Sequence, residues 1–191
     1  MESRHRVVAL IGMPGVGKSA VGRILAGLLG RPAVDLDELI ENTTGSTPAE
    51  IFARDGEAAF RQLEYQLLRS LVDSGTECVV ACGGGVVTEE ASRHLLATAC
   101  DTVWLEADTD TLLERVRQGG TVRPLLEGDP RAALVRLRAE RAGWYSEVSR
   151  LAIDTTGSSA AEVAETLEHD LRPGADQLRA TADERVPGAP S

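Results

Sequence analysis

The residues from Gly12 to Ser19 constrain the fold of this chain more than any other segment does. They read Gly-Met-Pro-Gly-Val-Gly-Lys-Ser and match the pattern G-x-x-x-x-G-K-[ST]. In this pattern glycines turn backbone N–H groups toward a phosphate, the lysine reaches the β- and γ-phosphates, and the serine hydroxyl binds Mg²⁺. Lys18 is also the only lysine among the 20 Lys and Arg residues of the chain. The segment therefore predicts a site for a nucleoside triphosphate.

The segments on either side of this motif have the patterns that a phosphate-binding loop needs. Residues 6–11 form an apolar, β-branched run of strand length, and residues 20–29 place apolar side chains on one helical face. A helix that begins after the loop adds the partial positive charge of its N-terminus to the phosphate site. We therefore expect a working P-loop. Its predicted nucleotide-binding residues are Gly12, Pro14, Gly15, Val16, Gly17, Lys18, Ser19 and Ala20.

Length and composition favour one soluble domain with a substantial core. The chain has 191 residues, of which 42% are hydrophobic and 26% are charged. Its formal net charge of −10 argues against a general nucleic-acid binder, which needs a basic face. No apolar stretch has the length of a membrane span, and the N-terminal residues do not resemble a signal peptide. We therefore expect a cytoplasmic monomer that binds neither nucleic acid nor membrane.

The three cysteines give no sign of a metal site or a disulfide framework. Cys78, Cys82 and Cys100 are odd in number, lie in or beside apolar strand-like runs and lack paired metal-ligand spacing. We expect them to be buried, reduced thiols, as in a cytosolic protein.

Strand-like and helix-like segments alternate along the chain to about residue 171. The expected strands are residues 6–11, 32–37, 77–82, 102–105 and 151–154. The expected helices are residues 20–29, a segment from about 47, and residues 57–73, 92–99, 109–118, 129–148 and 159–171. This alternation predicts an α/β fold of three layers, α/β/α, with a parallel five-stranded sheet and ligands at the carboxyl ends of its strands. Residues 1–171 would form this domain, and the polar residues 172–191 a disordered tail.

Two aspartates lie at the end of the second expected strand. In an extended chain, the side chains of Asp35 and Asp37 point to the same side, roughly 6–7 Å apart. One carboxylate could then hold Mg²⁺ through water while the other orients or deprotonates an attacking alcohol. Either aspartate could instead cap a helix that begins near Glu38. The spacing alone leaves both interpretations open.

Three further features of the sequence have more than one interpretation when they are taken alone. Gly83-Gly84-Gly85 directly follows an expected strand and could bring backbone N–H groups close to a ligand, or could be a flexible turn. Arg61 and Glu64 are one helical turn apart and, taken alone, are expected to form a surface ion pair of roughly 0.2–0.5 kcal/mol. A segment of about residues 113–126 contains glycines, a proline and arginines. It has the composition of a mobile lid or of an ordinary solvated loop.

Taken together, these motifs resemble those of the shikimate kinases, in the order of that family and over about residues 7–171. The matching segments are residues 12–19, 35–37, 51–61, 83–87 and 121–126. The resemblance implies a P-loop kinase fold with a mobile lid. It also implies phosphorylation of the 3-hydroxyl of shikimate by ATP and Mg²⁺, which gives shikimate 3-phosphate and ADP in chorismate and aromatic amino acid biosynthesis.

The resemblance implies roles for residues on the acceptor side of the site. Asp37 would contact the substrate hydroxyls as a base or as an orienting group. Arg61 and Arg141 would bind the substrate carboxylate, because a guanidinium fork matches a planar anion. Arg138 is close enough in sequence to compete with Arg141 for this role. Gly83–Gly85 would contact the substrate through their backbone.

On the nucleotide side, Ser19 and Asp35 would hold Mg²⁺, with Asp35 acting through water. Arg123 in the lid would reach the phosphates, and Arg117 would approach the nucleotide. The residues expected to take part in catalysis are Lys18, Asp37 and Arg123.

Two alternatives to a shikimate kinase fit parts of the same pattern. One is another small P-loop kinase, such as a gluconate kinase or a nucleoside monophosphate kinase. The acid pair, Arg61 and Gly83–Gly85 favour a polyhydroxylated carboxylate over a nucleobase as acceptor. The other is a nucleotide-binding module without catalysis, which would be expected to lack residues that this chain retains, such as Asp37.

Overall fold

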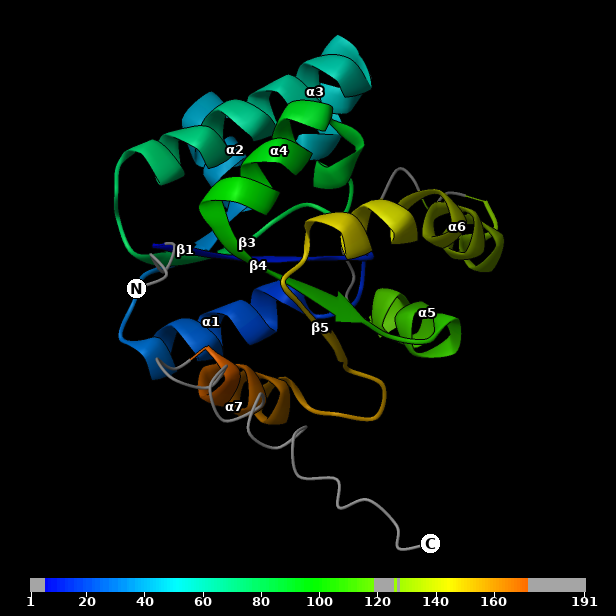
Figure 1. The fold of residues 1–191 in the computed structure, drawn as a ribbon. Coiled ribbons are helices and arrows are strands. Elements are labelled where there is room, and N and C mark those ends of the chain that lie inside the picture. The colour runs from blue at the N-terminus through cyan, green and yellow to red at the C-terminus, as the bar shows by residue number, and fades with distance from the viewer. Residues whose placement is uncertain (1–5, 119–125, 127, 172–191) are drawn as a thin grey trace, which may run out of the picture.

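Five parallel strands form the centre of the fold, between two layers of helices (Figure 1). The computed structural model describes residues 6–118, 126 and 128–171. The strands lie in the order β2-β3-β1-β4-β5, and each neighbouring pair is parallel. Their bounds are β1 (Val7–Gly12), β2 (Ala33–Asp35), β3 (Cys78–Ala81), β4 (Cys100–Glu106) and β5 (Leu151–Asp154). The predicted α/β/α architecture and its five-stranded parallel sheet are confirmed.

The helices cover both faces of this sheet. On one face, α1 (Lys18–Leu29) packs against α7 (Ala160–Asp170). The opposite layer contains α2 (Leu36–Thr44), α3 (Pro48–Asp73), the 3₁₀ turn η1 (Val86–Thr88), α4 (Glu90–Ala99) and α6 (Pro130–Val148). The helix α5 (Thr109–Gln118) packs against α6. Within these described ranges, none of the helices combines the length and the apolar character that crossing a membrane demands.

The inner strands β1 and β3 are the fully buried strands of the sheet. All residues of both strands are buried, because helices cover both faces, and this explains their continuous apolar sequences. Gly22 in α1 faces the sheet, where a Cβ would be in van der Waals contact with Cδ1 of Leu10 at 3.4 Å. This packing fixes the start of α1, and with it the motif lysine, against the ends of β1 and β3.

Local sequence signals determine where α3 begins and bends. The Thr47 hydroxyl accepts a hydrogen bond from the backbone N–H of Glu50, and the Glu50 carboxylate accepts one from the N–H of Thr47 at 2.7 Å. Pro48 occupies the first helical position, and Thr47 and Glu50 form a capping box at the start of the helix that was expected from about residue 47. Gly56 has φ 83° and ψ 170°, which interrupts α3 between the two helices expected from the sequence.

Two predicted segments lie wholly or partly outside the described residues. The expected tail, residues 172–191, is one of them. The other is the lid, of which residues 113–118 belong to α5 and Leu126 is buried, whereas Arg123 is outside the described part. The disordered tail, the mobile lid and the role of Arg123 therefore stay predictions.

We expect Thr47→Ala to lower the free energy of unfolding by about 0.5–2 kcal/mol, because the N–H of Glu50 loses its acceptor at the start of α3. Urea denaturation followed by circular dichroism measures this change. The control is Thr43→Ala, whose hydroxyl only bonds to the carbonyl of Leu39 within α2, and which should leave stability nearly unchanged. Equal losses in the two variants would contradict a capping role for Thr47.

Candidate active site

The P-loop joins β1 to α1 and aims backbone N–H groups at one point. Gly12 has φ +141°, and a Cβ there would collide with the backbone carbonyl of Leu105 in the neighbouring strand β4. The helix α1 begins at Lys18 after Gly17, which adopts a left-handed conformation and provides no side-chain cap. The first N–H groups of α1 therefore point toward the loop, where an anion would complete their hydrogen bonding. The Lys18 ammonium donates to the carbonyl of Gly12 at 3.0 Å, which holds it over the loop.

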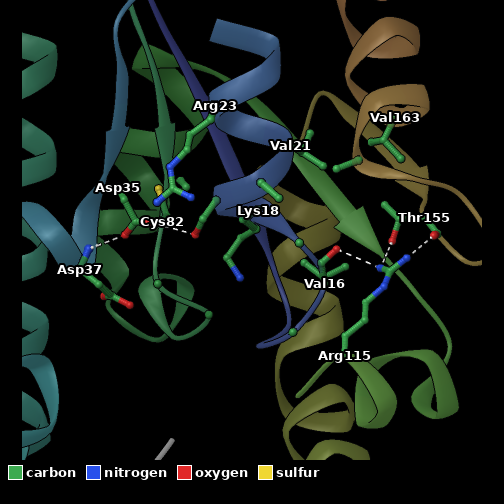
Figure 2. Close-up of a pocket in the computed structure, with 18 of the residues that line it drawn as sticks. Val16, Lys18, Val21, Arg23, Asp35, Asp37, Cys82, Arg115, Thr155 and Val163 are labelled. Atoms are coloured by element: carbon green, nitrogen blue, oxygen red, sulfur yellow. Dashed lines mark hydrogen bonds between the residues drawn. The ribbon is translucent and has the colours of Figure 1, made fainter. Parts of the chain in front are cut away.

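A pocket of about 770 Å³ opens in front of this loop, at the carboxyl ends of the strands. Its lining comes from the P-loop, the first turn of α1, the β2–α2 junction, the residues after β3, α5 and the β5–α7 loop. Figure 2 shows Lys18 in the middle of the pocket, with Asp35 and Asp37 on one side and Arg115 and Thr155 on the other. The P-loop and the acid pair thus face the same space, as the sequence predicts.

The acid pair has a different backbone conformation from the one expected. The strand β2 ends at Asp35 and α2 begins at Leu36, so Asp37 lies in the first helical turn and not on an extended strand. Asp35 is the N-cap of α2, and its Oδ1 accepts a hydrogen bond from the N–H of Asp37 at 3.1 Å. Its Oδ2 accepts a hydrogen bond from the Ser19 hydroxyl at 2.5 Å. The two interpretations of Asp35 are therefore compatible, because one carboxylate caps the helix and also faces the P-loop serine.

Ser19 and Asp35 bring two neighbouring oxygen groups into this pocket that could hold a magnesium ion. Mg²⁺ prefers oxygen ligands and is usually held by one or two protein groups together with water and substrate phosphates. The described residues contain no cluster of three or more His, Cys, Asp or Glu side chains that could hold a metal ion by themselves.

Arg115 is a pocket residue that the sequence reasoning missed. Its guanidinium in α5 donates to the carbonyl of Val16 in the P-loop at 3.1 Å. It also donates to the carbonyl of Thr155 at 2.8 Å and to that of Ser158 at 3.3 Å, both in the β5–α7 loop. Arg117, which the sequence analysis selected, is exposed and is not among the residues that line the pocket. Its predicted contact with the nucleotide stays a prediction.

The three consecutive glycines after β3 are each in contact with a different functional element. A Cβ on the first glycine of Gly83–Gly85 would overlap the carboxylate of Glu64, and one on the third would overlap the guanidinium of Arg61. A Cβ on the second would lie 2.9 Å from Cδ of Pro14 in the P-loop. The glycines thus allow the backbone to lie directly against the P-loop and against two charged side chains of α3. The flexible-turn alternative does not account for these contacts.

Arg61 and Glu64 form the predicted i,i+3 ion pair, but the pair is buried and not on the surface. The distance between Nη1 of Arg61 and Oε2 of Glu64 is 2.8 Å, and the two residues are 5% and 0% exposed. Burial raises the pKa of Glu64, and the neighbouring Arg61 guanidinium opposes that shift. The rings of Phe52 and Phe60 lie 5.4 and 5.1 Å from the Arg61 guanidinium carbon and restrict its position further.

Arg138 and Arg141, the two arginines of α6 that the sequence offered for the substrate carboxylate, make different contacts in the structure. Arg141 is 3% exposed, and its Nη1 donates to the carbonyl of Gly84 at 3.0 Å. Arg138 instead pairs with Glu106 at the end of β4 and donates to the carbonyl of Ala107. Arg141 is therefore the α6 arginine that lies at the triple glycine, which Arg61 also contacts from α3.

A family model described as shikimate kinase matches residues 14–172 of this chain. The chain belongs to the shikimate kinase family. The match includes most of the P-loop, the acid pair, the buried arginines and the triple glycine described above.

Individual members of the family are similar over most of their length. The chain is 43% identical over 159 residues to a shikimate kinase of Ruegeria pomeroyi, and the aligned region covers 83% of this chain and 80% of the relative. It is 42% identical over 164 residues to one of Symbiobacterium thermophilum, covering 84% of this chain and 94% of the relative. A shikimate kinase from Acinetobacter baumannii, solved in complex with shikimate, superimposes with a TM-score of 0.81 at 32% identity and 97% coverage of both chains.

The gluconate kinase alternative receives support at the level of the fold alone. A gluconokinase from Sinorhizobium meliloti superimposes with a TM-score of 0.62 but is only 20% identical, over 94% of this chain and 99% of its own. Both the identity and the TM-score are lower than for the shikimate kinase structure. The rival therefore shares the architecture without a comparable likeness in sequence.

The cysteine beneath the pocket should be unreactive in the folded protein. Cys82 lies directly before the triple glycine, and burial raises its pKa well above the usual value. Burial also raises the pKa of Cys78, and that of Cys100 to about 12. All three cysteines are free and buried, as the sequence predicts.

We expect no thiol to react with dithiobisnitrobenzoate within minutes at pH 8 in the folded protein, because a thiol with a raised pKa stays protonated and only the thiolate attacks. All three thiols should react after unfolding in guanidinium chloride. The absorbance of the released thionitrobenzoate counts them. Rapid release of one equivalent from folded protein would show that a thiol is accessible and ionised there.

Proposed function

We propose that this chain transfers the γ-phosphoryl group of ATP to the 3-hydroxyl of shikimate, giving shikimate 3-phosphate and ADP. The observation that supports a carboxylate-bearing acceptor is the pair of buried arginines at the triple glycine. The Nε atoms of Arg61 and Arg141 are buried and make no hydrogen bond within the described residues. A carboxylate placed between these guanidiniums would satisfy both donors and offset the repulsion between two buried cations.

The nucleotide phosphates would lie over the P-loop, at the start of α1. The Lys18 ammonium, now held by loop carbonyls, would exchange these for the β- and γ-phosphate oxygens. Arg115 would keep the loop in place through the carbonyl of Val16, which is 3.1 Å from its guanidinium. Arg123 would approach the phosphates from the lid, and Arg117 would approach the nucleotide.

Ser19 and Asp35 would hold Mg²⁺, the serine through its hydroxyl and the aspartate through water. When bound, the metal offsets negative charge on the β- and γ-phosphate oxygens. The present hydrogen bond between the two side chains, at 2.5 Å, keeps both oxygens at the mouth of the P-loop. In this way the chain would present an oxygen site before any nucleotide arrives.

Asp37 would bind the acceptor alcohol. Its Oδ1 would lie 3.5 Å from a Cβ built on Gly83, so the carboxylate is beside the glycine backbone and also lines the phosphate pocket. It would accept the proton of the 3-hydroxyl as the oxygen forms a bond to the γ-phosphorus. The bond from that phosphorus to the bridging oxygen of ADP breaks in the same displacement. Lys18 and Arg123 would offset the charge on the transferring group.

The cellular setting that we propose follows from composition and from the cysteines. A net charge of −10 does not suit a nucleic-acid partner, and three free thiols suit a reducing compartment such as the cytoplasm. We expect the enzyme to act there as a monomer, apart from membranes.

A coupled assay of ADP release tests the function directly. With ATP and Mg²⁺, we expect turnover that depends on shikimate, and little or none with gluconate or with nucleoside monophosphates. The two buried arginines fit a carboxylate and not a nucleobase, and the family likeness favours shikimate over gluconate, which is also a polyhydroxylated carboxylate. Turnover with gluconate in place of shikimate would favour the rival kinase, and ATP binding without any transfer would favour the non-catalytic module.

We expect Asp37→Asn to reduce kcat by roughly 100-fold or more, since an amide cannot accept the proton of the alcohol. The affinity for ATP, measured by titration calorimetry, should stay within about twofold. The matched control is Asp73→Asn, an exposed residue of α3 that pairs with Arg69 away from the pocket. A variant Asp37→Asn with unchanged kcat would remove this residue from the chemistry.

A further inference from the structure

Tyr145 in α6 is buried behind the triple glycine, and its hydroxyl donates a hydrogen bond to the carbonyl of Gly84. We propose that Tyr145 is a positioning residue that sets the orientation of the Gly84–Gly85 peptide for the acceptor substrate. This inference rests on the proposed function, in which the backbone of Gly83–Gly85 contacts shikimate. The tyrosine itself is not among the residues that line the pocket, so it acts through the glycines.

The ring of Tyr145 has little freedom to move. The residue is 1% exposed, and its ring stacks on that of Trp104 in β4 with centroids 5.8 Å apart and an interplanar angle of 28°. A ring fixed between a helix and the sheet delivers its hydroxyl to one place. Burial raises the pKa of Tyr145 to about 12, so the hydroxyl keeps its proton and remains a donor throughout the working range of the enzyme.

Gly84 is held on one side by α6 and on the other by the P-loop. Arg141 donates to the same oxygen at 3.0 Å, so two donors from α6 hold one acceptor. On the P-loop side, Pro14 lies against Gly84, where a Cβ would be 2.9 Å from the proline ring. The peptide is therefore held between α6 and the loop that receives the nucleotide.

Fixing the carbonyl of Gly84 also fixes the direction of the N–H of Gly85, which belongs to the same peptide group. A peptide group is planar and trans, so its oxygen and its N–H point in opposite directions. The oxygen of Gly84 points to Tyr145 and Arg141, and the N–H of Gly85 therefore points away from α6. Loss of the tyrosine hydroxyl would leave Arg141 as the donor from α6 and let the peptide rock. Arg141 would then be shared less favourably between this carbonyl and the substrate carboxylate.

We expect Tyr145→Phe to raise the KM for shikimate by roughly 3- to 10-fold, the change that corresponds to one net hydrogen bond. The KM for ATP should change by less than about twofold. The matched control is Tyr65→Phe on α3, whose hydroxyl only accepts a hydrogen bond from Arg69. Steady-state kinetics and thermal melting are measured for both variants. A merely structural role would lower the melting temperature or kcat without separating the two KM values.

Labelling with 3-fluorotyrosine gives a second measurement that needs no folded variant of Tyr145. The chain contains two tyrosines, so the labelled wild-type protein gives two ¹⁹F resonances, and Tyr65→Phe assigns them. Shikimate should shift the resonance of Tyr145 and leave that of Tyr65 in place. The inference is overturned if shikimate leaves both resonances unchanged, or if Tyr145→Phe alters the two KM values equally or neither. Absence of shikimate turnover in the wild-type protein would instead overturn the proposed function.

Discussion

Lack of space for side chains on Gly83–Gly85 is the constraint on which the rest of the site depends. The backbone at this point is pressed against Pro14 on one side and against the charged groups of α3 on another. A methyl group on any of the three would displace a functional residue. The triple glycine therefore acts as the common surface where β3, the P-loop, α3 and α6 meet.

The charges gathered around this surface are unfavourable for stability by themselves. Burying Arg61 with Glu64 costs desolvation energy that the ion pair recovers only in part, and Arg141 adds a second buried cation close by. Replacing buried ion pairs of this kind by apolar side chains of similar volume is often neutral or stabilising. The arrangement makes physical sense if an anionic ligand completes it, because the ligand then finds two guanidiniums already desolvated and fixed in position.

Features that depend on neighbouring residues in the chain could be predicted from the sequence. The P-loop and the capping box at Thr47 follow from local patterns, and the structure has both. The helical conformation of Asp37 was not predictable in the same way, because it depends on where β2 stops pairing with β3. The burial of Arg61 and Glu64 depends on the glycines packing over them from a distant part of the chain. Spacing alone predicts a surface pair.

The choice between neighbouring arginines shows the same limit in α5 and α6. Residues two apart lie on different faces of a helix, and residues three apart share a face but lie one turn apart along it. The placement of the helix therefore decides which of two neighbouring arginines reaches a site. The sequence allowed Arg117, whereas the placement of α5 against the P-loop brings Arg115 to the pocket. It selected Arg141 with Arg138 as a competitor, and the packing of α6 over β4 directs Arg138 to Glu106 and Arg141 to Gly84.

The single lysine of the chain also determines how the protein can be cut. A protease specific for lysine has one peptide bond to cleave in the whole sequence, the bond between Lys18 and Ser19. In the folded protein this bond is in the first turn of α1, where the loop and the helix hold it away from the extended form that proteases require. The rate of that one cut therefore measures how often the phosphate-binding loop opens. A ligand that keeps the loop closed should slow the cut in proportion to the fraction of protein that has bound it.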